Sequence, residues 1–291
     1  MKHRFSTVIF RIILFTFISG AAQAAVFNDH MGRKVRVPDH PQRIVTLTPG
    51  LTEVIFILGQ AHRLKGVTRY SDFPPEAAKL PQVGSYIRPE LEKILALRPD
   101  ICFATKDGNP RIIVSNLEAL GIPVYITQPT NLKTVMETIQ EIGDILGAEE
   151  RAEKVVADMR NRIAAVRRRA DALDSRPGVF FQIGISPIVS VGTDTFIHEL
   201  IILAGGRNLA AGPEPYPRFS REQVLGFSPD VLIITSMSRA KGFEKVKAEW
   251  SRWKNMPAAR NGKLHVVDSD LFDRPTPRLV DALEILFSLI H

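Results

Sequence analysis

Two segments of this chain repeat one another, and they constrain the fold more than any other feature of the sequence. Residues 91–101 and 221–231 lie 130 positions apart (221 − 91) and share Glu, Leu, Pro and Asp in the same register. Each segment predicts a short helix with a glutamate in its first turn, then a Pro-Asp turn and an apolar strand. One such unit in each half indicates two similar lobes, with a ligand cleft between them.

The N-terminus has the pattern of a secretory signal peptide. Basic residues come first, residues 12–18 form an apolar run, and Ala22-Gln23-Ala24 fits a cleavage site. A membrane anchor is the alternative, but a spanning helix needs about 20 apolar residues, and Arg11 and Gly20 keep this run shorter. We expect residues 1–24 to be removed by a cut after Ala24, which leaves a soluble, exported chain in the periplasm.

Charge and cysteine content narrow the possible partners. The chain has a formal charge of +7, and the signal segment contributes three positive residues and no negative ones, so the mature chain is +4 (7 − 3). This mild charge gives no indication of nucleic-acid binding. Cys102 is the only cysteine, so no intramolecular disulfide can form, and its apolar surroundings predict a small buried side chain in a strand.

Strands and helices alternate in both halves of the chain. This alternation predicts an α/β protein with mostly parallel sheets, that is, two Rossmann-like lobes joined by one long backbone helix. The expected N-terminal lobe covers residues 25–130, a helical linker 131–175, and the C-terminal lobe 176–291. The apolar strands are expected near residues 43–47, 66–68, 102–104, 124–126, 179–183, 232–234 and 264–267.

The linker contains one apolar stripe at helical spacing. Its members recur every three or four residues and are Ala152, Val156, Met159, Ile163, Val166, Ala170 and Leu173. A helix of about 25 residues is about 37 Å long, enough to run along both lobes. A coiled-coil dimer is the alternative, but the stripe covers little more than three heptads, so we favour an intramolecular strut in a monomer.

Common catalytic and metal-binding patterns are absent from the sequence. There is no glycine-rich phosphate loop, no Gly-x-Ser-x-Gly turn and no His-Glu-x-x-His pair. No histidine of the mature chain has a second histidine at metal-ligand spacing. We therefore expect no catalytic residue, no cofactor and no protein-bound metal. Trp250 and Trp253, three apart on an expected helix, predict core packing.

Taken in order, several short motifs resemble those of a known family. They are Thr46 to Pro49 with Thr52-Glu53, residues 70–75, Asp107 to Asn109, residues 181–184, residues 217–225, and residues 270–274 with Pro277-Arg278. In this order and spacing the chain resembles the periplasmic cobalamin-binding proteins of ABC importers, in the helical-backbone class of substrate-binding proteins. The likeness extends from about Gln42 to the last helix.

The resemblance implies a non-enzymatic receptor that carries a corrinoid to an inner-membrane permease dimer with its ATPase. In that family one surface glutamate on each lobe docks onto arginines of the permease, and the matching residues here are Glu92 and Glu222. Both occupy the same place in the internal repeat, which supports the assignment independently. The alternative is that each acid only complements the dipole of its helix, worth about 0.3–1 kcal/mol.

The resemblance also implies a set of ligand-binding residues in the cleft. They are Tyr70, Tyr86, Thr105, Ile183, Tyr216, Asp270, Leu271, Asp273, Arg274 and Arg278. Tyr70 and Tyr216 neighbour prolines in turn-rich loops, where an amphipathic ring can face a large flat ligand. The alternative for the two arginines is an ion-pair network around a helix N-terminus, with Asp270 and Asp273 as partners.

Several cleft positions lack the tryptophans of the family, so the identity of the macrocycle stays open. Haem or a ferric siderophore is the nearest alternative, with Tyr86 as a candidate iron ligand and with Arg69, Arg88 and Arg218 available to an anionic siderophore. Alternatives of other classes are an exported two-lobed enzyme that handles tetrapyrroles and a sensor that presents its ligand to a receptor.

Overall fold

The computed structural model describes residues 24–235 and 243–291. The expected signal peptide lies outside the described residues, apart from Ala24, which begins the first strand. Within these two ranges, no helix combines the length and the apolar character that crossing a bilayer requires.

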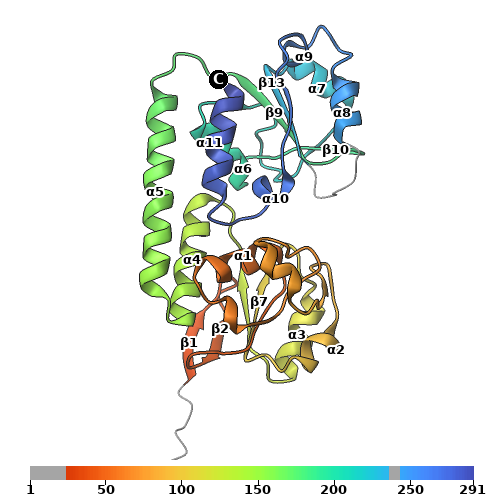
Figure 1. Ribbon diagram of the computed structural model, residues 1–291. Coiled ribbons are helices and arrows are strands. Elements are labelled where there is room, and N and C mark those ends of the chain that lie inside the picture. The colour runs from red at the N-terminus through yellow and green to blue at the C-terminus, as the bar shows by residue number, and fades with distance from the viewer. Residues whose placement is uncertain (1–23, 236–242) are drawn as a thin grey trace, which may run out of the picture.

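The N-terminal lobe, which contains β7 in Figure 1, is built on a parallel four-stranded sheet in the order β4-β3-β7-β8. Its strands are β3 Ile44–Thr46, β4 Leu64–Gly66, β7 Ile101–Thr105 and β8 Val124–Thr127. Its helices are α1 Pro49–Ile57, α2 Leu91–Ala96 and α3 Arg111–Ala119, with 3₁₀ turns η1 Ala61–Arg63 and η2 Pro75–Lys79. Two antiparallel hairpins flank it, β1 Ala24–Asn28 with β2 Lys34–Pro38 and β5 Gly84–Ser85 with β6 Arg88–Pro89.

The C-terminal lobe repeats this topology. Its parallel sheet has the order β11-β9-β13-β14, so in both lobes the strand order is second, first, third, fourth along the chain. The strands are β9 Gly178–Gln182, β11 Arg207–Asn208, β13 Val231–Ile234 and β14 Leu264–Val266, beside the pair β10 Ile188–Val189 and β12 Arg218–Phe219. The helices are α6 Phe196–Leu203, α7 Arg221–Phe227, α8 Phe243–Trp250, α9 Pro257–Arg260, α10 Ser269–Phe272 and α11 Leu279–Ile290.

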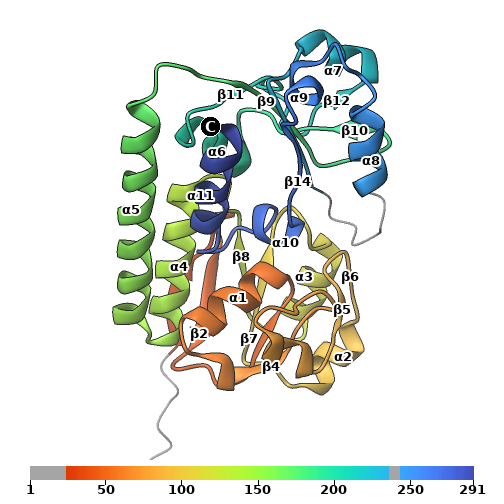
Figure 2. The ribbon, with the colours of Figure 1, turned by 45° about the horizontal axis from the view of Figure 1, so that its top comes forward.

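Two helices connect the lobes. Helix α4 Leu132–Leu146 follows β8, and helix α5 Glu149–Asp171 then runs beside both lobes (Figures 1 and 2). Its 23 residues span about 35 Å. The predicted apolar stripe faces the protein, with five of its members buried and Ile163 and Leu173 partly buried against the core.

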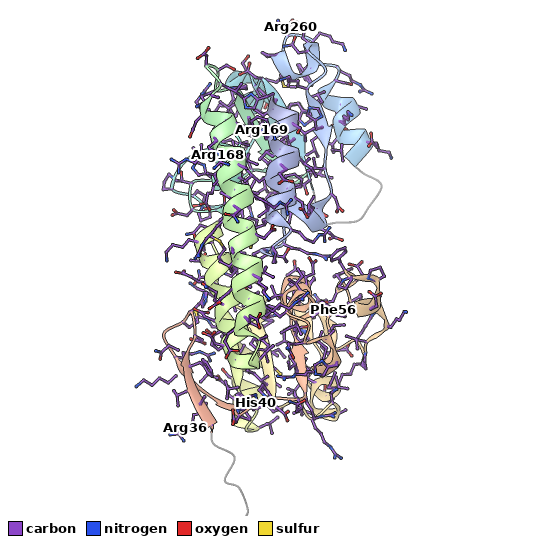
Figure 3. The ribbon with its side chains drawn as sticks, turned by 60° about the vertical axis from the view of Figure 1, so that its left-hand side comes forward. Arg36, His40, Phe56, Arg168, Arg169 and Arg260 are labelled. Carbon is purple, nitrogen blue, oxygen red and sulfur yellow. The ribbon has the colours of Figure 1, made fainter. Side chains whose placement is uncertain are left out.

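Polar contacts fix α5 to the C-terminal lobe. Arg162 donates hydrogen bonds to Asp281 at 2.6 Å and to Glu284 at 2.7 and 2.9 Å on α11. Arg169 lies 4.2 Å from the centre of the Phe287 ring, and Figure 3 shows it near the C-terminal end of α5. The expected strut is therefore an intramolecular helix packed on α4, α6 and α11.

The core has three parts that follow from strand alternation. In β7, Ile101 and Phe103 face a cluster shared with α4, α5 and α11, whereas Cys102 and Ala104 face an outer cluster of the N-terminal lobe. In β9 the shared cluster receives Val179 and Phe181, while Phe180 faces a separate outer cluster. Each lobe thus has its own outer core, and the helices unite the inner faces. Cys102 is buried, as expected.

The sequence repeat is also a repeat of backbone conformation. The residues before the two repeated prolines, Arg98 and Ser228, both have positive φ, 46° and 49°. Asp100 accepts hydrogen bonds from the backbone N–H groups of residues 42 and 43, and Asp230 accepts one from Gly178. Each aspartate therefore pins the start of the first strand of its own sheet, which explains why the Pro-Asp pair recurs.

One packing prediction is wrong. Trp250 is buried, but Trp253 is 43% exposed, because α8 ends at Trp250 and the chain turns before α9. The spacing of three that joined the two rings therefore does not lie on one helix. Trp253 instead lines a shallow surface hollow of about 410 Å³ with Arg221, Glu249 and Arg252.

Candidate functional site

On the N-terminal lobe, a buried asparagine organises the loops at the carboxyl ends of the strands. Asn109 accepts a hydrogen bond from the N–H of Thr105 at 2.8 Å and donates to the carbonyl oxygens of Leu47 and Tyr86 at 2.9 and 2.8 Å. A Cβ atom at Gly108 would lie 3.0 Å from the Tyr86 ring, so the missing side chain lets this ring approach the turn. Two of the predicted ligand-binding residues, Tyr86 and Thr105, are therefore neighbours.

Buried hydroxyl groups hold the loop that carries Tyr70. Thr52 is 2.7 Å from the hydroxyl of Thr46 and donates to Ser71 at 3.0 Å, and Ser71 is 3.0 Å from Thr68. These contacts tie the loop to α1 and β3. Tyr70 is 41% exposed at the surface of this loop.

On the C-terminal lobe, Tyr216 lies between charges from both lobes. Burial, followed by the charges of Asp107 and Asp273, raises the pKa of its phenol. Asp107 belongs to the N-terminal lobe and Asp273 to the C-terminal lobe, so the ring lies where the lobes face one another. It is 51% exposed, which leaves part of the ring accessible. Ile183, directly after β9, is half-buried.

Asp273 is a buried carboxyl group with an unused acceptor. Its Oδ2 atom accepts a hydrogen bond from Thr235 at 3.3 Å, whereas Oδ1 is buried and has no hydrogen-bond partner in the described part of the chain. Burial raises the pKa of Asp273 to about 7, with a further contribution from the carboxylates of Asp270 and Asp268. The group is therefore partly protonated near neutral pH and able to donate as well as accept.

The two predicted arginines form ion pairs across the lobes. Arg274 is buried and donates to Glu53 of α1 at 2.7 Å and to the carbonyl oxygen of Tyr70 at 3.1 Å, and it pairs with Asp270 at 2.7 Å. Arg278 contacts the second oxygen of Glu53 at 3.4 Å and lies 3.8 Å from the centre of the Phe73 ring. This geometry is the ion-pair network that the sequence analysis gave as the alternative to ligand binding by the two arginines. Among the described residues, Asp270 is a partner in this network and Asp273 is not.

Leu271, on α10, packs against the shared core, as does Ile183 among the other predicted ligand residues. Asp268 caps the same short helix by accepting the N–H of Asp270 at 2.8 Å. Direct ligand contact by any of the predicted cleft residues stays a prediction.

Glu92 and Glu222 project from equivalent helices. Both are exposed, in the first turns of α2 and α7, and neither has an ion pair to another residue of the described ranges. The carboxylate of Glu222 is stabilised by backbone and Ser220 hydrogen bonds, which lower its pKa. Two charged carboxylates are thus presented to solvent at the same place on each lobe.

Two residues that matter in this geometry were not predicted as site residues. Glu53 and Asn109 stood within the resembling motifs, but neither carried a signal for its role, because both act through partners far away in the sequence. Within residues 24–235 and 243–291, no group of three or more His, Cys, Asp or Glu side chains is arranged to hold a metal ion.

The comparisons with known proteins cover almost the whole molecule. The sequence profile of the family described as periplasmic binding protein matches residues 44–271. A vitamin B12-binding protein from Photorhabdus laumondii is 32% identical over 247 residues, which are 84% of this chain and 86% of the relative.

Solved structures with the same fold are named as binding proteins for two different ligands. The crystal structure of the periplasmic vitamin B12-binding protein BtuF of Vibrio cholerae has a TM-score of 0.76 and 29% identity, and the match covers 87% of this chain and 98% of that one. The periplasmic heme-binding protein RhuT from Roseiflexus sp. RS-1, in apo form, has a TM-score of 0.77 and 30% identity, covering 86% and 97%.

Proposed function

The chain belongs to the periplasmic binding protein family, and from this premise we propose that it captures cobalamin or a related corrinoid and delivers it to an inner-membrane ABC importer. The observation that carries the proposal is the match to curated vitamin B12-binding relatives over most of both chains. The signal-like N-terminus and the family support export to the periplasm, with cleavage after Ala24. We assign the lobes to residues 25–130 and 176–291, joined by the helical connection 131–175.

The tyrosines of both lobes suit a large macrocycle. Tyr70 and Tyr86 come from loops of the N-terminal lobe and Tyr216 from the C-terminal lobe, and the first and last are exposed. An aromatic ring offers a broad apolar face at low entropic cost, and its hydroxyl reaches polar groups at the edge of a ligand. We assign these three rings to the two faces of the bound corrinoid.

Asp273 supplies the polar recognition. A carboxylic acid that is neutral can donate a hydrogen bond to an amide carbonyl of a corrinoid side chain, which a carboxylate cannot do. The unpartnered Oδ1 atom is the position from which this bond would be made. Thr105 and Ile183, at the ends of β7 and β9, complete the wall of the site.

Haem is the second candidate, favoured by the solved heme-binding neighbour with equal similarity. Haem iron needs an axial ligand from the protein, such as His or Tyr. A tyrosine ligates iron as phenolate, and the raised pKa of Tyr216 opposes that form. Tyr86 is then the candidate haem ligand, whereas cobalamin brings its own axial ligands and places no such demand on this chain.

Docking on the permease is assigned to Glu92 and Glu222. The proposal rests on their equal positions in the repeat, their exposure and their lack of ion-pair partners in the described ranges. Glu76 in η2 and Glu244 in α8 are also exposed and lie in first turns, but they are outside the repeat. They form a matched control pair for charge reversal.

A titration of the mature chain tests the ligand. Purified protein is titrated with cyanocobalamin, haemin and a ferric siderophore, and binding is followed by absorbance and by calorimetry. We expect one-to-one binding of cyanocobalamin at micromolar concentration or below, and recovery of the ligand unchanged, as for a receptor rather than an enzyme. Tight binding of haemin with a tyrosinate spectrum, and no binding of any corrinoid, would replace cobalamin with haem.

A further inference from the structure

Arg274 joins the two lobes away from the backbone helix α5. It follows α10 on the C-terminal lobe, yet three of its hydrogen bonds go to the N-terminal lobe: to Glu53 at 2.7 Å, the Tyr70 carbonyl at 3.1 Å and Asp72 at 3.4 Å. Asp270, on its own lobe, holds the guanidinium from the other side at 2.7 Å. Figure 2 shows α10 between the lobes, directly above α1.

The partner on α1 is more deeply buried than the arginine. Glu53 is 1% exposed and Arg274 is 8% exposed, and 221 residues separate them in the sequence. A buried charge that loses its partner is left without water or counter-ion, so separating such a pair is far more costly than breaking a surface ion pair. The ion pair between Glu53 and Arg274 therefore holds the two lobes together.

Neighbouring contacts make the connection broader than one ion pair. Arg278 reaches the other oxygen of Glu53 and stacks on Phe73, which also belongs to the N-terminal lobe. A Cβ atom at Gly50 would lie 3.4 Å from the methyl group of Thr276, so the start of α1 lies directly against the loop after α10. The loop between α10 and α11 is thus seated on α1.

We propose that Glu53 and Arg274 form an interlobe latch that sets the spacing of the lobes and thereby the lifetime of the ligand complex. Helix α5 fixes the lobes along one side of the molecule, and the latch fixes them directly to each other at the junction of α1 with α10. Opening the lobes far enough to release a bulky ligand separates Glu53 from Arg274. In this arrangement Arg274 is a positioning residue that acts through Glu53, not a ligand contact. The statement about the ligand rests on the proposed function, whereas the statement about lobe spacing does not.

The distance between the lobes can be measured without any ligand. Cys102 is fully buried, so spin labels attach selectively to cysteines introduced at the exposed positions Ser115 on α3 and Ala248 on α8. Pulsed electron resonance then gives the distribution of distances between the lobes. The variants are Glu53→Gln, which keeps the shape of the side chain, and Glu53→Gln with Arg274→Gln, which removes both buried charges of the pair. The matched control is Glu118→Gln, which breaks the ion pair with Arg33 inside the N-terminal lobe.

The latch predicts a broader and longer distance distribution for Glu53→Gln and for the double variant, and an unchanged one for Glu118→Gln. If Glu53→Gln does not fold, the double variant is the test, because it does not leave the buried charge of Arg274 without Glu53. With cyanocobalamin, stopped-flow dissociation from Glu53→Gln should be about 10-fold faster than from the wild type. Distance distributions that match the wild type in both latch variants would overturn the proposal. A wild-type chain that binds no corrinoid would overturn the proposed function and leave the distance test intact.

Discussion

Replacing Asp273 by Asn tests the electrostatics of the site through the stability of the unliganded protein. In the unfolded chain this carboxyl group titrates near 3.8, whereas burial in the folded protein raises its pKa to about 7. The folded state thus keeps its proton over a range in which the unfolded state has lost it. The free energy of unfolding falls as pH rises through this range, and the loss is complete above pH 7.

The size of the effect follows from the two pKa values. The difference between 3.8 and about 7 corresponds to about 4 kcal/mol above pH 7, of which less than half is already present at pH 5. Asn cannot ionise, so the substitution removes this penalty while leaving an oxygen for Thr235. We expect Asp273→Asn to stabilise the protein at pH 8 by about 2–3 kcal/mol more than at pH 5, or by about 5 °C more in Tm.

Thermal and urea unfolding at the two pH values provides the measurement. All other titrating groups are common to both proteins, so the difference between variant and wild type isolates Asp273. The control is Asp174→Asn, an exposed aspartate in the loop after α5, for which the change in Tm should be the same at both pH values. Equal shifts for Asp273→Asn at pH 5 and pH 8 would show that this carboxyl group is ionised in the folded protein throughout, and the argument for a neutral hydrogen-bond donor would be refuted.

Three further predictions concern the ligand, the permease and the backbone helix. Tyr216→Ala should weaken cyanocobalamin binding by about 10-fold in calorimetry through lost ring contact, whereas Trp253→Ala, which removes an exposed ring elsewhere, should leave it within twofold; equal losses would argue against a specific role. Charge reversal of both Glu92 and Glu222 to Lys should abolish ligand uptake by the reconstituted importer with little change in ligand affinity. Uptake equal to that of the control variant, in which Glu76 and Glu244 are reversed to Lys, would point to a sensor. Met159→Ala should lower the free energy of unfolding by about 2–5 kcal/mol in urea, since the side chain is 1% exposed on the buried face of α5, and a loss below about 1 kcal/mol would contradict that packing.

Local patterns in the sequence were enough to predict the architecture. The repeat predicted α2 with β7 and α7 with β13, because helix caps, Pro-Asp turns and apolar strands are encoded by adjacent residues. The spacing of the apolar stripe predicted α5 for the same reason. A capping box of Ser220 and Gln223, three residues apart in the sequence, begins α7.

The site was less predictable because its properties depend on long-range partners. Nothing in the loop after α10 indicates that Arg274 pairs with a glutamate 221 residues earlier, and nothing near Asp273 indicates how far burial raises its pKa. The prediction for Trp253 was wrong for a related reason. The end of α8 is set by the turn toward α9 and not by the spacing of the two tryptophans. The periodicity of a sequence describes one helix or strand at a time, whereas the contacts between the lobes join elements from both halves of the chain.

The duplication also explains why the latch is placed where it is. In each lobe the helix that follows the first strand carries a glutamate bound by the segment that leaves the last strand of the other lobe: Glu199 of α6 accepts the N–H of Leu132 at the start of α4, and Glu53 of α1 binds Arg274 after β14. The two contacts differ in chemistry, because water can replace the glutamate at a half-buried helix N-terminus but not beside a buried guanidinium. Glu199→Gln should therefore change the lobe distance less than Glu53→Gln does, although the two glutamates occupy related places in the duplicated fold. If both substitutions widen the distribution equally, the spacing of the lobes depends on their shared topology, and the buried charge of Arg274 has no special part in it.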